Sequence, residues 1–157
     1  MPRRFEVRHS PIHGRGVFAT IDLPAQTVLI QYRGRLLTHA QADRWYGDGA
    51  DTGHTFLFTL NDQYIVDANV GGNSARWINH SCAPNCEAFI EEVDGARRDR
   101  VLIRTSRAIR AGEELTYDYG IVLDVPHTAK MKRIWACHCG SVKCTGTMLQ
   151  PRRRSGR

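Results

Sequence analysis

The chain has 157 residues, a length that suits one compact domain with a single hydrophobic core. Hydrophobic residues make up 41% and charged residues 24%, which is ordinary for a globular protein, and no apolar run is long enough to predict a membrane span. The formal net charge of +6 is a modest basic excess that does not by itself establish nucleic-acid binding.

Both ends of the chain are basic. The first ten residues, MPRRFEVRHS, contain no apolar signal-peptide core, so we expect an intracellular protein. We interpret residues 1–9 as an N-terminal basic segment and residues 150–157, which contain PRRRSGR, as a basic tail. These termini could make weak contacts with nucleic acid or with a partner bound to it, and a solubilising role is the alternative.

Between the ends, short runs rich in Val, Ile, Phe, Tyr and Thr are separated by Gly, Pro and Asp, a pattern typical of strands. The predicted strands cover residues 16–20, 27–34, 54–60, 63–68, 100–109 and 114–120. One hairpin should turn at Asn61 and Asp62, and a second turn is centred on Asp94 and Gly95. The chain is therefore predicted to be mostly β and built from small sheets.

Few helices are predicted. The segment Thr38–Gly47 begins with an N-cap threonine and ends with glycine, which predicts one short helix. Residues 73–79 fit a single helical turn. Residues 121–136 show no clear pattern, and we expect this linker to run over the surface.

Three of the five cysteines form a Cys-x-Cys-x4-Cys array near the end of the chain: Cys137, Cys139 and Cys144. In an intracellular chain such a cluster indicates a metal more than disulfides. Zinc prefers four ligands in a tetrahedron, so one ligand is missing from the array. His138 lies between two ligands and should point away from the metal, which favours a distant cysteine. Spacing alone does not choose between Cys82 and Cys86.

The segment RWINHSCAPNC, Arg76–Cys86, concentrates ligand and hydrogen-bonding residues in one bend. Together with SPIHGRGVFA, GEELTYDYG and CHCGSVKCTGTM, it resembles the SET-domain protein lysine methyltransferases of the trithorax-like kind. The similarity runs from about Ser10 to about Leu149. It implies a SET domain over residues 10–120, a linker over 121–136 and a post-SET zinc segment over 137–149. The implied fold is β-clip-like, with small curved sheets and a C-terminal pseudoknot in which the Asn-His segment passes beneath the Tyr-x-Tyr segment.

The resemblance implies methyl transfer from S-adenosylmethionine to a lysine amine in a protein with a basic tail, a histone or a histone-like protein. Zinc would be structural and held by four cysteines: Cys82, Cys137, Cys139 and Cys144. Cys86 would be a packed spare thiol. The resemblance also implies activating partner subunits. It places the protein in the nucleus of a eukaryote or the cytoplasm of a bacterium, and not in a membrane.

The resemblance also assigns roles to single residues. Tyr119 would be the catalytic tyrosine, and Tyr117 would limit the product mainly to monomethyl-lysine. The substrate channel would be aromatic and lined by Phe56, Phe58, Tyr117 and Tyr119. The cofactor would contact His13, Arg15, Gly16, Phe56, Asn79, His80 and His138. Arg76 would support the Asn-His segment by hydrogen bonds. Phe56 departs from the family, which has a tyrosine there, and this leaves one hydroxyl contact in doubt.

Two other functions compete with this one. A non-catalytic SET-fold module could bind basic peptides or chromatin partners, and the missing hydroxyl at Phe56 fits that alternative. A zinc-dependent nucleic-acid binder would use the basic tail and the cysteine cluster. The family residues at Asn79, His80 and Tyr119 favour the enzyme over both.

Overall fold

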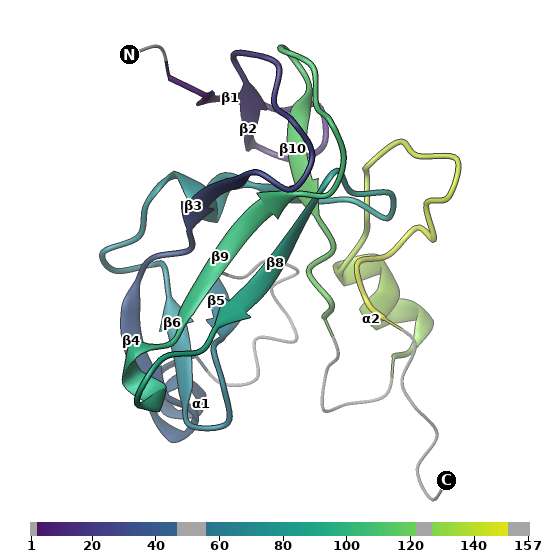
Figure 1. Ribbon diagram of the computed structural model, residues 1–157. Coiled ribbons are helices and arrows are strands. Elements are labelled where there is room, and N and C mark those ends of the chain that lie inside the picture. The colour runs from purple at the N-terminus through teal and green to yellow at the C-terminus, as the bar shows by residue number, and fades with distance from the viewer. Residues whose placement is uncertain (1–2, 47–55, 122–126, 151–157) are drawn as a thin grey trace, which may run out of the picture.

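The computed structural model describes residues 3–46, 56–121 and 127–150, and in them the chain forms three small sheets (Figure 1). The described strands are β1 Phe5–His9, β2 Arg15–Ala19, β3 Val28–Gln31, β4 Arg35–Thr38, β5 Leu57–Thr59, β6 Tyr64–Asp67, β7 Asn79–His80, β8 Cys86–Glu91, β9 Arg100–Thr105 and β10 Glu114–Tyr117. The described helices are α1 His39–Tyr46, α2 Ala129–Ile134 and the 3₁₀ turns Ser74–Trp77 and Ala96–Arg98. None of them is long and apolar enough to cross a membrane. The predicted mostly β fold is confirmed.

The first sheet has the strand order β1-β2-β10-β7 and brings distant motifs together. Strand β10 pairs antiparallel with β2 on one side and parallel with β7 on the other. In the parallel pair, Asn79 lies opposite Thr116 and His80 lies opposite Tyr117. The Asn-His and Tyr-x-Tyr segments are therefore neighbours, as the family resemblance led us to expect.

The other two sheets are antiparallel, with the orders β3-β9-β8 and β4-β6-β5. Four strands were not predicted: β1, β4, β7 and β8. Residues 5–9 were read as a basic segment, yet Phe5 and Val7 alternate with Glu6 and Arg8, so one face of β1 packs against the core while the other stays in solvent. The sequence of β8, CEAFIE, mixes polar and apolar residues without clear alternation, and its six-residue register with β9 stabilises it as a strand.

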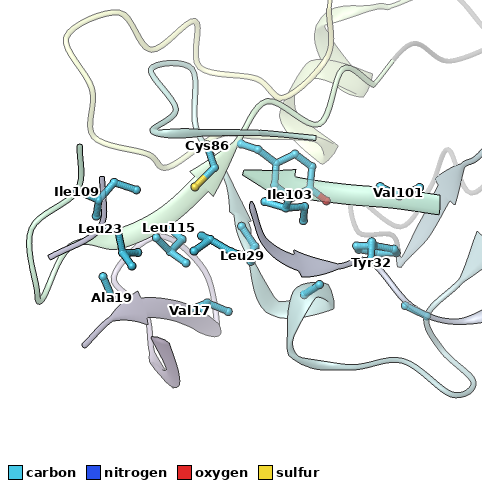
Figure 2. Close-up of a cluster of buried hydrophobic side chains, with 14 of the residues drawn as sticks. Val17, Ala19, Leu23, Leu29, Tyr32, Cys86, Val101, Ile103, Ile109 and Leu115 are labelled. Atoms are coloured by element: carbon cyan, nitrogen blue, oxygen red, sulfur yellow. The ribbon is translucent and has the colours of Figure 1, made fainter. Parts of the chain in front are cut away.

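The main hydrophobic core lies where the three sheets meet (Figure 2). Val17, Ile78, Ile103 and Leu115 are almost completely buried in it. The Cys86 side chain also points into this core and is 1% exposed. This core therefore joins the first sheet, which carries the Tyr-x-Tyr segment, to the sheet that contains β8 and β9.

Two predicted turns and two predicted helices are confirmed. The Asn61 side chain accepts hydrogen bonds from the backbone N–H groups of Gln63 and Tyr64, both at 2.9 Å, which closes the β5–β6 hairpin. Gly95, at the tip between β8 and β9, has a φ of +94°, which favours glycine. The Thr38 hydroxyl accepts from the Gln41 backbone N–H at 3.1 Å and so caps α1.

The described part of the predicted linker 121–136 stays largely at the surface but contains a helix that the sequence pattern did not indicate. Helix α2 forms there, with the Thr128 hydroxyl accepting from the Met131 backbone N–H at 3.2 Å. Trp135, which follows α2, is 3% exposed and packs with Leu149 in a small second core. The segment lacks a local pattern because its apolar residues find their partners in the C-terminal segment, beside α2 in Figure 1.

Candidate active site

A cavity of about 550 Å³ lies between the first sheet and the C-terminal segment. Its wall is made of residues from six parts of the chain: Ile12–Arg15, Phe56, the segment with Arg76, Trp77, Asn79 and His80, Tyr119, Arg133–His138, and Met148. Most of the predicted cofactor residues line it: His13, Arg15, Phe56, Asn79, His80 and His138. A cavity of this size with mixed aromatic and polar walls is suited to a small-molecule cofactor.

Asn79 holds the loop that forms the first wall. Its side-chain amide donates to the carbonyl oxygens of His13 at 3.2 Å and Arg15 at 3.0 Å. The same amide donates to Oε2 of Glu114 at 2.8 Å. Because these bonds occupy the amide, the Asn79 side chain shapes the wall rather than reaching freely into the cavity.

Gly16 does not line the cavity, although it was predicted to contact the cofactor. A Cβ atom at this position would lie 2.3 Å from Oε2 of Glu114 and 3.0 Å from Cβ of Ser10. The glycine therefore serves the close packing of β2 against Glu114. Gly14 lines the cavity instead, with a φ of +44°.

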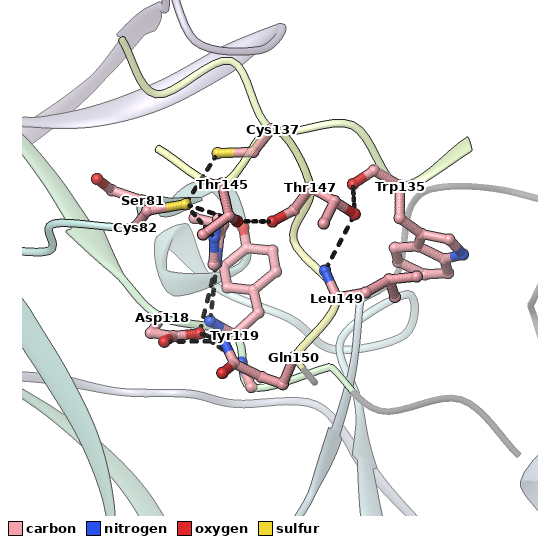
Figure 3. Close-up of polar contacts among 12 residues, drawn as sticks. Ser81, Cys82, Asp118, Tyr119, Trp135, Cys137, Thr145, Thr147, Leu149 and Gln150 are labelled. Atoms are coloured by element: carbon pink, nitrogen blue, oxygen red, sulfur yellow. Dashed lines mark hydrogen bonds and ion pairs between the residues drawn. The ribbon is translucent and has the colours of Figure 1, made fainter. Parts of the chain in front are cut away.

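His80 connects the cavity to the cysteines. Its Nδ1 accepts a hydrogen bond from the Tyr119 backbone N–H at 3.0 Å, and its Nε2 lies 3.8 Å from Sγ of Cys82. Burial lowers the pKa of His80, and the nearby Asp118 carboxylate only partly opposes this effect. The imidazole is therefore neutral at neutral pH, and Nδ1 is the acceptor nitrogen. Figure 3 shows Asp118, Tyr119 and Cys82 around this position.

A second, narrow cavity of about 40 Å³ adjoins the first. It is lined mainly by aromatic and apolar side chains: Tyr32, Leu57, Phe58, Tyr117, Tyr119 and Ile121, with Arg76. The ring centroids of Tyr117 and Tyr119 are 4.9 Å apart, and those of Phe58 and Tyr117 are 6.2 Å apart. Tyr119 and Arg76 line both cavities, so the two spaces meet at these residues.

The tyrosines of the narrow cavity remain protonated. Burial raises the pKa of Tyr117 and of Tyr119 well above the usual value, and neighbouring tyrosines add to the effect. The Tyr119 hydroxyl donates a hydrogen bond to the carbonyl oxygen of Ile78. This bond fixes the ring at the junction of the two cavities.

Tyr32 belongs to the narrow cavity, and the sequence analysis missed it. Its hydroxyl donates to the carbonyl oxygen of Phe56 at 2.8 Å, and its ring centroid is 5.3 Å from that of Phe58. Burial raises its pKa as well. Tyr32 lies in the predicted strand 27–34, where a buried aromatic residue looks like any other core position.

Phe56 lines the larger cavity but not the narrow one, which differs from its predicted place in the channel. Its ring packs edge-on against Trp77, with centroids 5.4 Å apart. The Phe56 backbone, rather than its side chain, faces Tyr32 through the hydrogen bond above.

Arg76 also differs from its prediction. We expected Arg76 to support the Asn-His segment by hydrogen bonds, but its side chain donates from Nη1 to the carbonyl oxygen of Ala68, at 3.3 Å. The guanidinium carbon lies 4.6 Å from the Trp77 ring centroid and 5.5 Å from that of Phe56. The two aromatic rings and the Ala68 carbonyl oxygen, rather than Asn79 or His80, position this cation.

Four cysteines come together beside the cavity: Cys82, Cys137, Cys139 and Cys144, with all Sγ atoms within 4.8 Å of one another. The Sγ atoms of Cys82 and Cys137 are 3.7 Å apart. Tetrahedral zinc with bonds of about 2.3 Å would hold thiolates about 3.8 Å apart, so the donor set fits zinc. Cys86 is excluded from this cluster by its burial in the main core, which raises the pKa of its thiol to about 12.

The C-terminal segment is tied to the cysteine cluster by further polar contacts (Figure 3). The Thr145 hydroxyl lies 3.7 Å from Sγ of Cys82 and donates to the carbonyl oxygen of Thr147 at 2.9 Å. The Thr147 hydroxyl donates to the carbonyl oxygen of Trp135 at 3.0 Å. Through these contacts the cluster positions the residues that close one side of the larger cavity.

Comparison with known proteins gives a family match over most of the chain. The family described as "SET domain" matches residues 14–120. Histone-lysine N-methyltransferase trithorax of Drosophila virilis is 37% identical over 140 residues, which cover 88% of this chain and 3% of the relative. Human histone-lysine N-methyltransferase 2D is 37% identical over 137 residues, covering 86% of this chain and 2% of the relative.

A third relative matches a larger share of this chain. The histone-lysine N-methyltransferase, H3 lysine-4 specific, of Emericella nidulans is 37% identical over 155 residues, which cover 92% of this chain and 11% of the relative. The chain thus corresponds to a small part of each of these relatives.

Proposed function

The chain belongs to the SET-domain family, and on that premise we propose that it transfers a methyl group from S-adenosylmethionine to the side-chain amine of a lysine in a protein. The observation that carries this proposal is the meeting of two cavities at Tyr119. The larger cavity is wide enough for a cofactor, and the narrow one is lined by rings that suit an apolar lysine stem. A methyl donor and a methyl acceptor would therefore approach each other at one hydroxyl.

The larger cavity would hold S-adenosylmethionine, which supplies a methyl group on a positively charged sulfur. The loop with His13 and Arg15 offers backbone groups shaped by Asn79. His80 and His138 line the cavity and would lie near the polar and adenine parts of the molecule. Phe56 and Trp77 provide aromatic faces, which attract a cation.

The narrow cavity would select a lysine side chain. Phe58 and Tyr117 would pack on its methylene stem, and this desolvated position favours the neutral amine that the reaction needs. Tyr119, kept protonated by burial, would orient the amine nitrogen in line with the methyl carbon. Tyr32, which completes the wall, would restrict the space around the amine.

Zinc would have a structural role. Its ligands would be the four clustered cysteines: Cys82, Cys137, Cys139 and Cys144. The cluster joins the Asn79–Cys82 bend to the segment that carries Trp135 and His138, and these two residues line the larger cavity. Binding of the metal would therefore close one wall of the cofactor site.

The substrate would be a histone or a histone-like protein with a lysine in a basic tail. The relatives named as histone-lysine N-methyltransferases support this choice. The product would be mainly monomethyl-lysine because Tyr117 limits the space in the channel. Such a protein would act on nuclear chromatin in a eukaryote or in the cytoplasm of a bacterium, with partner subunits that raise its activity. The basic ends would add weak nucleic-acid contacts, although residues 151–157 lie outside the described residues.

The test uses purified protein, labelled S-adenosylmethionine, a histone mixture and a basic bacterial extract. A labelled protein band is expected with the wild type, and the label should disappear in Tyr119→Phe and in Cys139→Ser. Cys86→Ala, which changes a thiol outside the cluster, is the matched control and should retain activity. Peptide binding without any label would instead favour the non-catalytic binding module.

A further inference from the structure

Arg76 is placed where the two cavities meet. Its guanidinium carbon lies 4.6 Å from the Trp77 ring centroid and 5.5 Å from the Phe56 ring centroid, and Nη1 donates to the carbonyl oxygen of Ala68. Two aromatic faces and one backbone acceptor therefore hold this cation beside Tyr119.

No carboxylate among the described residues forms an ion pair with Arg76. The acidic groups nearest to this region have other partners. On β6, Asp67 pairs with Arg35 at 2.8 Å. On β10, Glu114 accepts from Ser10 and Asn79, both at 2.8 Å. Arg76 therefore has no ion-pair partner among the described residues, although, in addition to burial, Asp67 and Glu114 also act electrostatically on the tyrosines of the narrow cavity and raise the pKa of Tyr32 and of Tyr119.

The tyrosines around the junction add no negative charge of their own. Tyr32, Tyr117 and Tyr119 stay uncharged because they are buried. Nδ1 of His80 accepts a hydrogen bond from the Tyr119 backbone N–H at 3.0 Å and lies 3.7 Å from the Asp118 carboxylate. Arg15 adds a second cation, 5.4 Å from the Trp77 ring centroid.

We propose that Arg76 is a positioning residue for the reaction, whose fixed charge excludes the ammonium form of the bound lysine and favours the neutral amine. This inference rests on the proposed methyl transfer. The amine nitrogen forms the new N–C bond with its lone pair, while the C–S bond breaks and its electrons remain on sulfur. An ammonium has no lone pair, so only the neutral form reacts.

Charge balance explains why this cation need not slow the transfer itself. A neutral amine and a sulfonium carry one positive charge in total before and after the methyl group moves. An ammonium and a sulfonium together carry two. A neighbouring cation therefore penalises entry of the ammonium more than it penalises the reacting pair.

The experiment compares the wild type with Arg76→Met and Arg76→Lys. Methionine removes the charge but keeps an apolar stem against Trp77, whereas lysine keeps the charge. The measurement is kcat for a synthetic histone H3 tail peptide between about pH 7 and pH 10, a range chosen to span the acid side of lysine titration. For unit charges about 7 Å apart at an effective dielectric constant near 20, the acid limb of the Arg76→Met profile should move up by about 1.7 pH units.

At pH 8 the Arg76→Met variant should therefore be slower by about fiftyfold, and the difference should shrink as the pH rises toward 10. In Arg76→Lys the acid limb of the kcat profile should lie at the same pH as in the wild type. The proposal would be overturned if Arg76→Met lost the same fraction of kcat at every pH, or if the acid limb of its kcat profile stayed at the wild-type pH. Arg76 would then have a packing role only. Thermal unfolding of each variant checks that the fold is intact.

A second readout does not depend on turnover. The side chain of the peptide lysine, labelled with carbon-13, is titrated by NMR in complex with each protein. The pKa of this lysine should be higher in complex with Arg76→Met than with the wild type. A wild type that binds the peptide without methylating it would contradict the proposed function, and this titration would still decide the role of Arg76. A peptide that does not bind would overturn both.

Discussion

The backbone N–H of Tyr119 donates a hydrogen bond to Nδ1 of His80, at 3.0 Å, and the two rings meet edge-on with centroids 5.4 Å apart. His80 lies on β7, which pairs in parallel with β10, and it is two residues from Cys82. A short segment therefore links the wall of the larger cavity, the proposed catalytic tyrosine and the cysteine cluster. A substitution at any one of these three sites should therefore alter the geometry of the other two.

Replacing Tyr119 by phenylalanine should abolish most of the methyl transfer. The variant loses the hydroxyl that would orient the amine, and such a loss of positioning costs about a hundredfold in kcat. It also leaves the Ile78 carbonyl oxygen without its hydrogen bond, which should cost about 1 kcal/mol of unfolding free energy. Steady-state kinetics and urea unfolding measure the two effects separately. Activity within a few-fold of the wild type would exclude Tyr119 from the reaction.

Replacing Tyr117 by phenylalanine should raise the di- and trimethyl fraction of the product. The channel is narrow, and loss of one hydroxyl makes room for a methylated amine without removing the ring that packs against Tyr119. Mass spectrometry of a methylated histone peptide gives the product ratio. Tyr64→Phe, on β6 and outside both cavities, is the control and should leave the ratio unchanged. An unchanged ratio in Tyr117→Phe would contradict the proposed role.

Zinc content should distinguish Cys82 from Cys86. Cys82→Ser removes one ligand of the cluster, so the purified variant should lose its zinc and unfold at a lower temperature. Cys86→Ala leaves the four ligands intact and should retain about one zinc per chain, with a loss of roughly 1 kcal/mol from the core. Metal analysis and thermal unfolding provide the data. Zinc loss in Cys86→Ala together with retention in Cys82→Ser would reverse our assignment.

Stability should depend on pH through Asp67. Burial of this carboxyl would raise its pKa, but hydrogen bonds from Tyr46, Arg35 and Asn69 outweigh burial and hold the pKa below its usual value. Because the folded pKa is the lower one, the ionised carboxylate stabilises the protein above about pH 4, and this stabilisation is lost as the pH falls through the folded pKa.

Urea unfolding of Asp67→Asn at several pH values tests this dependence. At pH 7 the variant should be less stable than the wild type by about 2 kcal/mol, because a buried charged acceptor is lost, and the gap should narrow below about pH 4. Glu6→Gln, which breaks an exposed pair with Arg8, should change stability by less than about 1 kcal/mol. A gap that stays constant with pH would show that Asp67 does not titrate in this way.

Local patterns in the sequence were enough for much of the fold. The hairpin at Asn61, the capped helix after Thr38 and the strand that contains Leu115 all follow from side-chain alternation, turn residues and caps, which act over a few residues. The same analysis missed β8 and α2, since neither has a strong local pattern and each is stabilised by a distant partner.

The sequence by itself determined which residue types were available for chemistry: the tyrosines of the Tyr-x-Tyr segment, the Asn-His pair and three clustered cysteines with a fourth to be found. Only the tertiary structure decided how they are used. It brought Cys82 to the cluster and buried Cys86 in the core, because burial and direction depend on packing between sheets rather than on spacing. In the same way it placed Phe56 in the larger cavity alone, added Tyr32 to the narrow one and made the Arg76 cation part of the lining of both.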